Sequence, residues 1–72
     1  DADKDKIGSL TKREMDMIIK IASGMSNKEI ANTLNITERT VKNHISSLFK
    51  KIGVSDRTQA AVFAIKNNLI IL

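Results

Sequence analysis

Residues 26–51, SNKEIANTLNITERTVKNHISSLFKK, decide the fold of this chain. They contain two amphipathic segments joined by four or five residues, and basic and amide side chains gather on the second segment. Apolar residues in both segments recur at the three- and four-residue spacing of an α-helix. The stretch therefore predicts two consecutive helices, the second with a polar face turned outward.

Helix starts and ends are marked along the rest of the chain. The predicted N-caps are Thr11 and Ser26, each followed by the glutamate of a capping box at Glu14 and Glu29, and also Thr37 and Ser55. Gly24 and Gly53 are placed to end helices, because glycine enters the left-handed conformation cheaply. The expected helices lie near residues 12–23, 27–34, 38–52 and 56–67. With no proline, no alternating apolar pattern and no repeat, the sequence predicts an all-α four-helix bundle.

Each of the first three predicted helices has an apolar stripe that we assign to the core. The stripes are Met15, Ile18, Ile19 and Ala22; then Ile30, Ala31 and Leu34, with Ile36 filling the turn; then Val41, Ile45, Leu48, Phe49 and Ile52. The third helix turns a second set of side chains away from its stripe: Arg39, Lys42, Asn43, Ser46, Ser47 and Lys50. The first half of this outer face therefore offers cations, an amide and hydroxyls to a partner.

Size and composition limit the function. Seventy-two residues make one domain with a small core, and the polar start at residues 1–9, which has no methionine, is expected to be a linker remnant before a domain over residues 10–72. With no cysteine and one histidine, neither a disulfide framework, a metal site nor a cofactor is expected. No apolar stretch approaches the roughly 20 residues that span a bilayer, and no secretory signal is present. We therefore expect a cytoplasmic chain with no membrane partner.

Charge is unevenly distributed along the chain. Residues 1–16 hold five of the eight acids and have a net charge of −1, whereas residues 17–72 carry eight Lys and Arg against three acids, a net charge of +5. A basic body favours an anionic partner such as nucleic acid or a membrane surface. The placement of the basic residues has to decide between them.

The outer face of the third predicted helix suits duplex DNA. The major groove is about 12 Å wide and admits one helix, and its base edges are bound by side chains such as Lys, Arg and Asn. The start of the second helix, at residues 26–28, offers free N–H groups and a cation to a phosphate. The alternative is that the polar face of this helix is merely exposed to solvent and binds no partner.

Several spaced motifs resemble one family. LTKRE at residues 10–14, GMSNKEIA at 24–31, TERTVKNHI at 37–45 and VSDRTQA at 54–60 resemble the LuxR/GerE-type helix-turn-helix domain. The resemblance covers residues 10–69 and is closest to the C-terminal output domain of NarL/FixJ-type bacterial response regulators. It implies sequence-specific binding of double-stranded DNA by a transcriptional regulator of a two-component system, with the third helix in the major groove and a homodimer formed through the fourth. It also implies an N-terminal receiver domain, which this chain lacks.

The resemblance also implies particular DNA contacts. The groove-facing positions fall on Lys42, Asn43 and Ser46, which the outer face of the third helix also contains. The backbone-contacting positions fall on Asn27, Lys28, Thr37, Arg39, Thr40, His44, Lys50 and Lys51. Three basic residues have a second interpretation: His44 borders the apolar stripe and could be structural, Lys51 could be merely solvated, and Arg57 could either reach a phosphate or pair with Glu29 or Asp56.

The fourth predicted helix has apolar residues on two sides. Ala60, Phe63 and Ala64 gather on one side, and the other side holds Thr58, Ala61, Val62, Ile65 and Leu69. One core cannot bury both sides, so we assign the second to a dimer interface, formed chiefly on DNA. The alternative is that the tail NNLIIL, residues 67–72, folds back over it.

Other classes of function fit less well. The acids are expected at caps or on the surface, so no catalytic pair is predicted and the chain is not expected to be an enzyme. A protein-interaction module that is basic but does not bind DNA is the main alternative. A salt titration separates the two, because duplex affinity falls steeply with salt when several phosphates are neutralised.

Overall fold

The computed structural model describes residues 2–70, and this part of the chain forms five α-helices and no strand. The helices are α1 (Ala2–Gly8), α2 (Lys12–Ala22), α3 (Asn27–Leu34), α4 (Glu38–Ile52) and α5 (Arg57–Lys66). The prediction of an all-α fold is confirmed. The predicted bounds of α3 and α4 are also confirmed, while α2 and α5 are shorter than expected and α1 was not expected.

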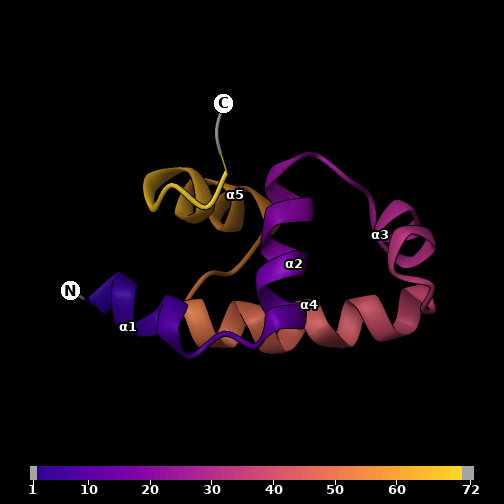
Figure 1. The fold of residues 1–72 in the computed structure, drawn as a ribbon, viewed down its shortest axis with the longest axis horizontal. Helices are drawn as coiled ribbons and strands as arrows, with labels where there is room; N and C mark the ends of the chain where they lie inside the picture. Colours follow the sequence, from indigo (N-terminus) through magenta and orange to yellow (C-terminus); the bar gives the residue numbers. More distant parts are fainter. Residues whose placement is uncertain (1, 71–72) are drawn as a thin grey trace.

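The longest helix, α4, supports the other elements. In Figure 1, α2 crosses α4 near its middle, α3 lies against the first half of α4, and α1 lies beside its second half. Helix α5 packs on α2. This arrangement leaves one side of α4 uncovered near its N-terminus, next to α3.

Capping explains where most helices begin. Both predicted capping boxes are present: Thr11 Oγ1 accepts from the Glu14 N–H at 3.1 Å while Glu14 Oε1 accepts from the Thr11 N–H at 2.9 Å, and the same pair of bonds joins Ser26 and Glu29 at 3.2 and 3.0 Å. Thr37 caps α4 by accepting from the Thr40 N–H at 3.1 Å. Three of the four predicted N-caps are thus confirmed.

The fourth predicted cap, Ser55, is wrong by one residue. Asp56 caps α5, because its carboxylate accepts from the Gln59 N–H at 2.8 Å. The Ser55 N–H instead donates to the side-chain oxygen of Gln59 at 2.8 Å. Serine and aspartate are comparable caps, so sequence alone does not choose between neighbours.

The start of the chain, which we predict to be a linker remnant, forms the helix α1. Its acids Asp3 and Asp5 lie in the first turn and Lys6 in the last, which suits the helix dipole. Ile7 packs against the core, and Asp3 Oδ2 lies 3.1 Å from Asn67 Nδ2 and accepts its hydrogen bond. Helix α1 buries no residue fully, so it has no apolar stripe to reveal it. The division into residues 1–9 and 10–72 stays a prediction.

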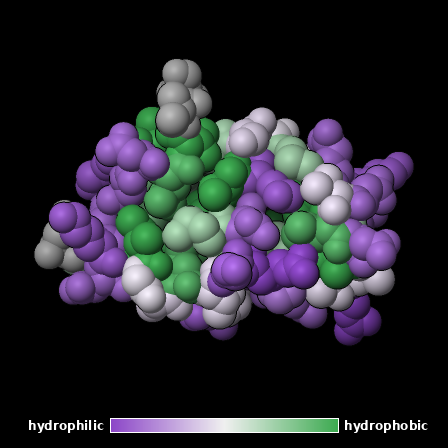
Figure 2. All heavy atoms as spheres, viewed as in Figure 1, coloured by the Kyte–Doolittle hydropathy of each residue, from purple (hydrophilic) through white to green (hydrophobic). Residues whose placement is uncertain are grey.

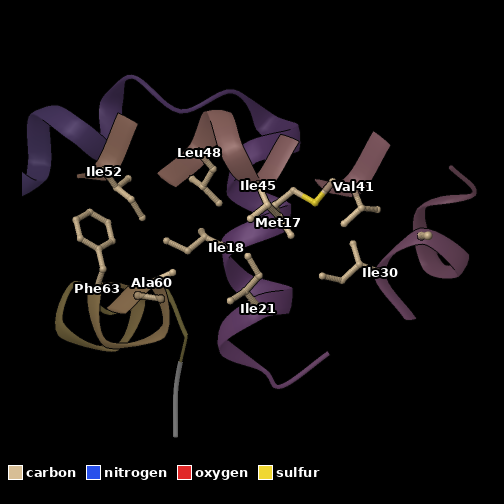
Figure 3. Packing of buried hydrophobic residues seen from close by; sticks show 12 residues of the cluster. Met17, Ile18, Ile21, Ile30, Val41, Ile45, Leu48, Ile52, Ala60 and Phe63 are labelled. Carbon is tan, nitrogen blue, oxygen red and sulfur yellow. The ribbon is translucent and has the colours of Figure 1, made fainter. Parts of the chain in front are cut away.

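One hydrophobic core joins α2, α3, α4 and α5 (Figure 3). Its buried members are Met17, Ile18, Ile21, Ile30, Ala31, Val41, Ile45, Leu48, Ile52, Ala60, Phe63 and Ala64. The predicted stripe of α4 is confirmed apart from Phe49, which is only half-buried. The predicted side of α5 that holds Phe63 is also confirmed as buried.

The predicted stripe of α2 is partly wrong. Ile18 is buried as expected, but Met15, Ile19 and Ala22 are only partly buried, and the fully packed side of α2 contains Met17 and Ile21 instead. The buried residues 14, 17, 18 and 21 have ideal helical spacing, yet the first of them is a glutamate. Because a glutamate occupies the first of these positions, the buried face of α2 does not appear in the sequence as a continuous apolar stripe.

Candidate nucleic-acid interface

The exposed face of α4 is held in place by the buried face beneath it. Val41 is fully buried and Ile45 is nearly so, while Lys42, Asn43 and Ser46 are exposed. The two sets alternate at helical spacing, so fixing the apolar set on the core projects the polar set outward. The three predicted base-contacting residues therefore lie on one uncovered side of a rigid helix.

The turn between α3 and α4 sets the angle between these two helices. Asn35 ends α3 in the left-handed conformation, with φ 58°, which asparagine tolerates. The Ile36 N–H then bonds to the Ala31 carbonyl at 3.0 Å, and the Ile36 side chain packs against the core, as predicted. Two helices joined by such a short turn, with the second exposed, form a helix-turn-helix.

Predicted backbone-contacting residues lie at both ends of this face. Arg39, Lys28 and Lys50 are exposed. The hydroxyls of Thr37 and Thr40 are 2.9 Å apart and share one hydrogen bond, so one hydroxyl hydrogen of the pair is left to donate outward. His44 is half-buried, and both of its interpretations stay open.

The start of α3 combines free donors with one carboxylate. The N–H groups of Asn27 and Lys28 have no acceptor within residues 2–70, as expected for the first turn of a helix. The carboxylate of Glu29 is held by the capping box, and the hydrogen bond from the Ser26 N–H keeps the pKa of Glu29 below its ordinary value. The Glu29 carboxylate is thus already bonded within the domain, to the backbone at the start of α3.

Arg57 lies at this same place, with partners that the sequence did not suggest. Its Nη1 donates to Asn27 Oδ1 at 2.7 Å, and its Nη2 donates to the Met25 carbonyl. Neither predicted carboxylate partner is used, because Glu29 completes a capping box and Asp56 caps α5. Within the described chain, the guanidinium forms no ion pair, so its charge is not neutralised by a contact.

Lys51 differs from the other predicted backbone contacts. Its ammonium lies 2.7 Å from Glu14 Oε1 and donates to the Ser9 carbonyl at 3.2 Å. Glu14 also accepts from the Thr11 N–H, and more weakly from the Ser47 hydroxyl at 3.4 Å. Two of the three ammonium donors of Lys51 are thus used within the fold, so the structure favours a role for Lys51 in holding α4 on α2.

The pKa of Glu14 follows from this network. The hydrogen bond from Lys51 and then that from the Thr11 N–H lower the pKa of Glu14 below its ordinary value, against a smaller opposing effect of burial. Glu14 is the only buried charged residue among those described, with 5% of its surface exposed. Sequence reasoning missed it as the centre of a network, although residues 14, 17, 18 and 21 share one helical face.

The second side of α5 stays partly uncovered. Val62 and Ile65 are 57% and 39% exposed, Thr58 is exposed and Ala61 is half-buried. Leu69 differs from the group, because its N–H bonds to the Ala64 carbonyl at 2.8 Å and its side chain packs against the core. Residues 67–70 of the tail therefore fold back in part, without covering Val62 and Ile65. Residues 71 and 72 of that tail lie outside the described residues.

The surface differs between the two ends of the molecule. In the view of Figure 2, apolar side chains gather where α5 lies, and polar side chains prevail around α3 and the first half of α4. Among residues 2–70, no three His, Cys, Asp or Glu side chains come close enough to hold a metal ion. The same part of the chain has no helix long and apolar enough to cross a membrane.

Comparison with known proteins identifies relatives over this whole region. Residues 8–64 match the family described as bacterial regulatory proteins of the luxR family. The uncharacterised transcriptional regulatory protein YhcZ of Bacillus subtilis is 56% identical over 69 residues, which are 96% of this chain and 32% of YhcZ. The transcriptional regulatory protein LiaR of Bacillus subtilis is 55% identical over 86% of this chain and 29% of LiaR.

A third relative is the response regulator protein VraR of Staphylococcus aureus strain Mu3. It is 51% identical over 61 residues, which are 85% of this chain and 29% of VraR. The chain thus spans about a third of the length of the curated relatives it matches.

Proposed function

We propose that α4 enters the major groove of a DNA site, because this chain belongs to the luxR family of bacterial regulatory proteins. The chain is the DNA-binding output domain of a transcriptional regulator, not an enzyme. The observation that carries this proposal is the row of exposed Lys42, Asn43 and Ser46 above the buried face of α4. Lysine and asparagine donate to base edges in the major groove, and serine fits either base or phosphate. These three residues are proposed to contact bases.

The DNA backbone would be held on both sides of α4. We assign phosphate contacts to the cations and donors that flank the helix. They are the exposed Lys28, Thr37, Arg39 and Lys50 and the half-buried Asn27 and Thr40, with His44 at the edge of the face. Such contacts fix the register of the protein on the duplex but do not specify bases. Lys51 is left out because its ammonium is bonded to Glu14.

Replacing Lys42 or Asn43 by alanine tests the groove face. We expect each variant to lose about 1–3 kcal/mol of binding free energy at a specific site, because a base-edge contact is removed. The measurement is fluorescence anisotropy on a duplex selected from a random pool. The melting temperature should stay the same, since both side chains are exposed. Parent-like binding by both variants would show that this face does not read the bases.

Salt provides the second arm of that experiment. Affinity for duplex should fall steeply with salt if several phosphates are neutralised, and a Lys50→Ala variant should have a slope smaller by about one. Lys42→Ala and Asn43→Ala should reduce specific binding more than binding to a scrambled duplex. An affinity that does not depend on salt would favour the basic protein-interaction module.

We further propose that the domain forms a homodimer on DNA through the uncovered side of α5. Val62 and Ile65 are large apolar residues exposed on one helix, beside Thr58 and Ala61. A two-fold pair through this surface would present two copies of α4 to half-sites about one helical turn, or roughly 34 Å, apart. The surface is small, so the pair is expected to form chiefly on DNA.

A Val62→Arg variant tests the dimer. Because Val62 is 57% exposed, the variant should keep its melting temperature and its binding to a half-site, but lose cooperative occupation of a duplex with two half-sites. The measurement is a gel-shift titration on both duplexes. Ser23→Arg, which adds the same charge at the exposed end of α2, should remain cooperative. Parent-like cooperativity of Val62→Arg would rule out dimerisation through α5.

The whole protein is proposed to be a response regulator that acts on DNA in the cytoplasm. The chain covers about a third of its relatives, one of which is named as a response regulator protein. We propose that an N-terminal receiver domain occupies the remaining length and controls DNA binding. The test is to join a receiver domain to this chain and compare DNA affinity with and without phosphorylation.

A further inference from the structure

Arg57 contacts one of the proposed phosphate-binding residues rather than a carboxylate. Its two terminal nitrogens join α5 to the start of α3 through Asn27 Oδ1 and the Met25 carbonyl. The first contact spans 30 residues of sequence. Arg57 and Asn27 are both half-buried, so the contact is part of the packed structure.

This contact fixes which way the amide of Asn27 is turned. An asparagine amide has an acceptor oxygen and a donor nitrogen, and a guanidinium has donors only. Arg57 can therefore bond only to the oxygen, and this leaves Nδ2 of Asn27 as the free end of the amide. Within residues 2–70, that nitrogen has no acceptor.

We propose that Arg57 is a positioning residue for DNA binding, which holds Asn27 so that Nδ2 donates to a backbone phosphate. The proposal rests on the proposed function, since it requires the start of α3 to lie on the DNA backbone. The amide is turned to donate before DNA arrives, so binding does not have to order it.

A double-mutant cycle on DNA affinity tests the coupling. Asn27→Ala should weaken binding to the selected duplex about threefold to tenfold, the net value of one typical hydrogen bond. Arg57→Ala should weaken binding to the same duplex to a similar degree. The affinity of the double variant should lie within about twofold of that of the single variant that binds more weakly. If the loss of affinity in the double variant instead equals the product of the losses in the two single variants, Arg57 acts independently of Asn27 and the proposal is wrong.

Asn27→Asp keeps the test decisive if Arg57→Ala folds poorly. An aspartate at this position would pair with Arg57 and lie in the first turn of α3, where a negative charge is favourable, so the melting temperature should stay equal or rise. DNA affinity should nevertheless fall at least tenfold, because a donor has been replaced by a charge that repels phosphate. A purely structural contact would give the opposite pattern, with DNA affinity following stability, and parent-like DNA binding by this variant would refute the proposal.

Lys42→Ala separates failure of this inference from failure of the proposed function. Suppose that Lys42→Ala loses specific binding while the affinity losses of Asn27→Ala and Arg57→Ala multiply in the double variant. Then α4 still reads the groove, and only the positioning role of Arg57 is wrong. If Lys42→Ala and Asn43→Ala both bind like the parent, the proposed groove face is wrong, and the positioning role of Arg57 is refuted with it.

Discussion

Replacing Leu48 by alanine is expected to lower the free energy of unfolding by about 2–5 kcal/mol, through lost burial and a cavity. Leu48 is fully buried and points from α4 toward Ile18 of α2 (Figure 3). It therefore lies where the helix that carries the proposed DNA face meets the centre of the core. Loss of this contact should loosen α4 from its support.

The measurement is urea unfolding of parent and variant at the same temperature. At roughly 0.05–0.15 kcal/mol per residue, a domain of this size has so little stability that the loss is a large part of the total. Ser46→Ala, two residues away on the exposed side, should change stability by no more than about 0.5 kcal/mol. Phe49→Ala should cost less than a fully buried aromatic, because Phe49 is half-exposed to solvent. A Leu48→Ala variant as stable as the parent would contradict the packing of α4 on α2.

Local signals in the sequence were enough to predict α3 and α4. Ser26 with Glu29 and Thr37 each form the predicted cap, and Gly53 ends α4 in the left-handed conformation with φ 72°. These features depend on residues within one turn of each other, so they are visible in the sequence. The exposure of Lys42, Asn43 and Ser46 could be predicted as well, because a helix with one side buried in the core turns its other side to solvent.

Contacts between distant residues could not be predicted in the same way. Lys51 reaches Glu14 across 37 residues, and Arg57 reaches Asn27 across 30. In both pairs an ordinary surface interpretation was available for each residue, and the local pattern favoured it. The stripe of α2 was misassigned for this reason, since a buried glutamate is acceptable only when its partner is known.

Removing the partner of Glu14 should have the second large effect on stability. Breaking a fully buried ion pair costs about 3–5 kcal/mol. The side chain of Lys51 is 35% exposed and the Thr11 N–H would still bond to Glu14, so we expect Lys51→Met to cost about 1–3 kcal/mol at neutral pH. Lys50→Met, a change of the same charge at an exposed neighbour without an ion pair in the described chain, should cost much less.

DNA binding distinguishes the two roles considered for Lys51. If Lys51 holds the fold, the folded Lys51→Met protein should bind DNA with nearly the affinity and salt dependence of the parent. Lys50→Met should show the reverse, with unchanged stability and a smaller salt slope. A Lys51→Met variant that is fully stable but has a reduced salt slope would show that Lys51 contacts the DNA backbone.

The pH dependence of stability identifies the partner of Lys51. The pKa of Glu14 in the folded protein lies below its ordinary value of 4.5, so the ion pair contributes its full stability above that value and loses it as pH falls through the folded pKa. Without Lys51, the pKa of Glu14 moves back toward the ordinary value. The difference in unfolding free energy between parent and Lys51→Met should therefore be constant above about pH 5.5 and shrink steadily below about pH 4.5. Urea titrations at a series of pH values measure this difference, and other carboxylates cancel because both proteins contain them. A difference that stays constant down to the lowest pH at which both proteins fold would mean that Lys51 stabilises the domain without Glu14.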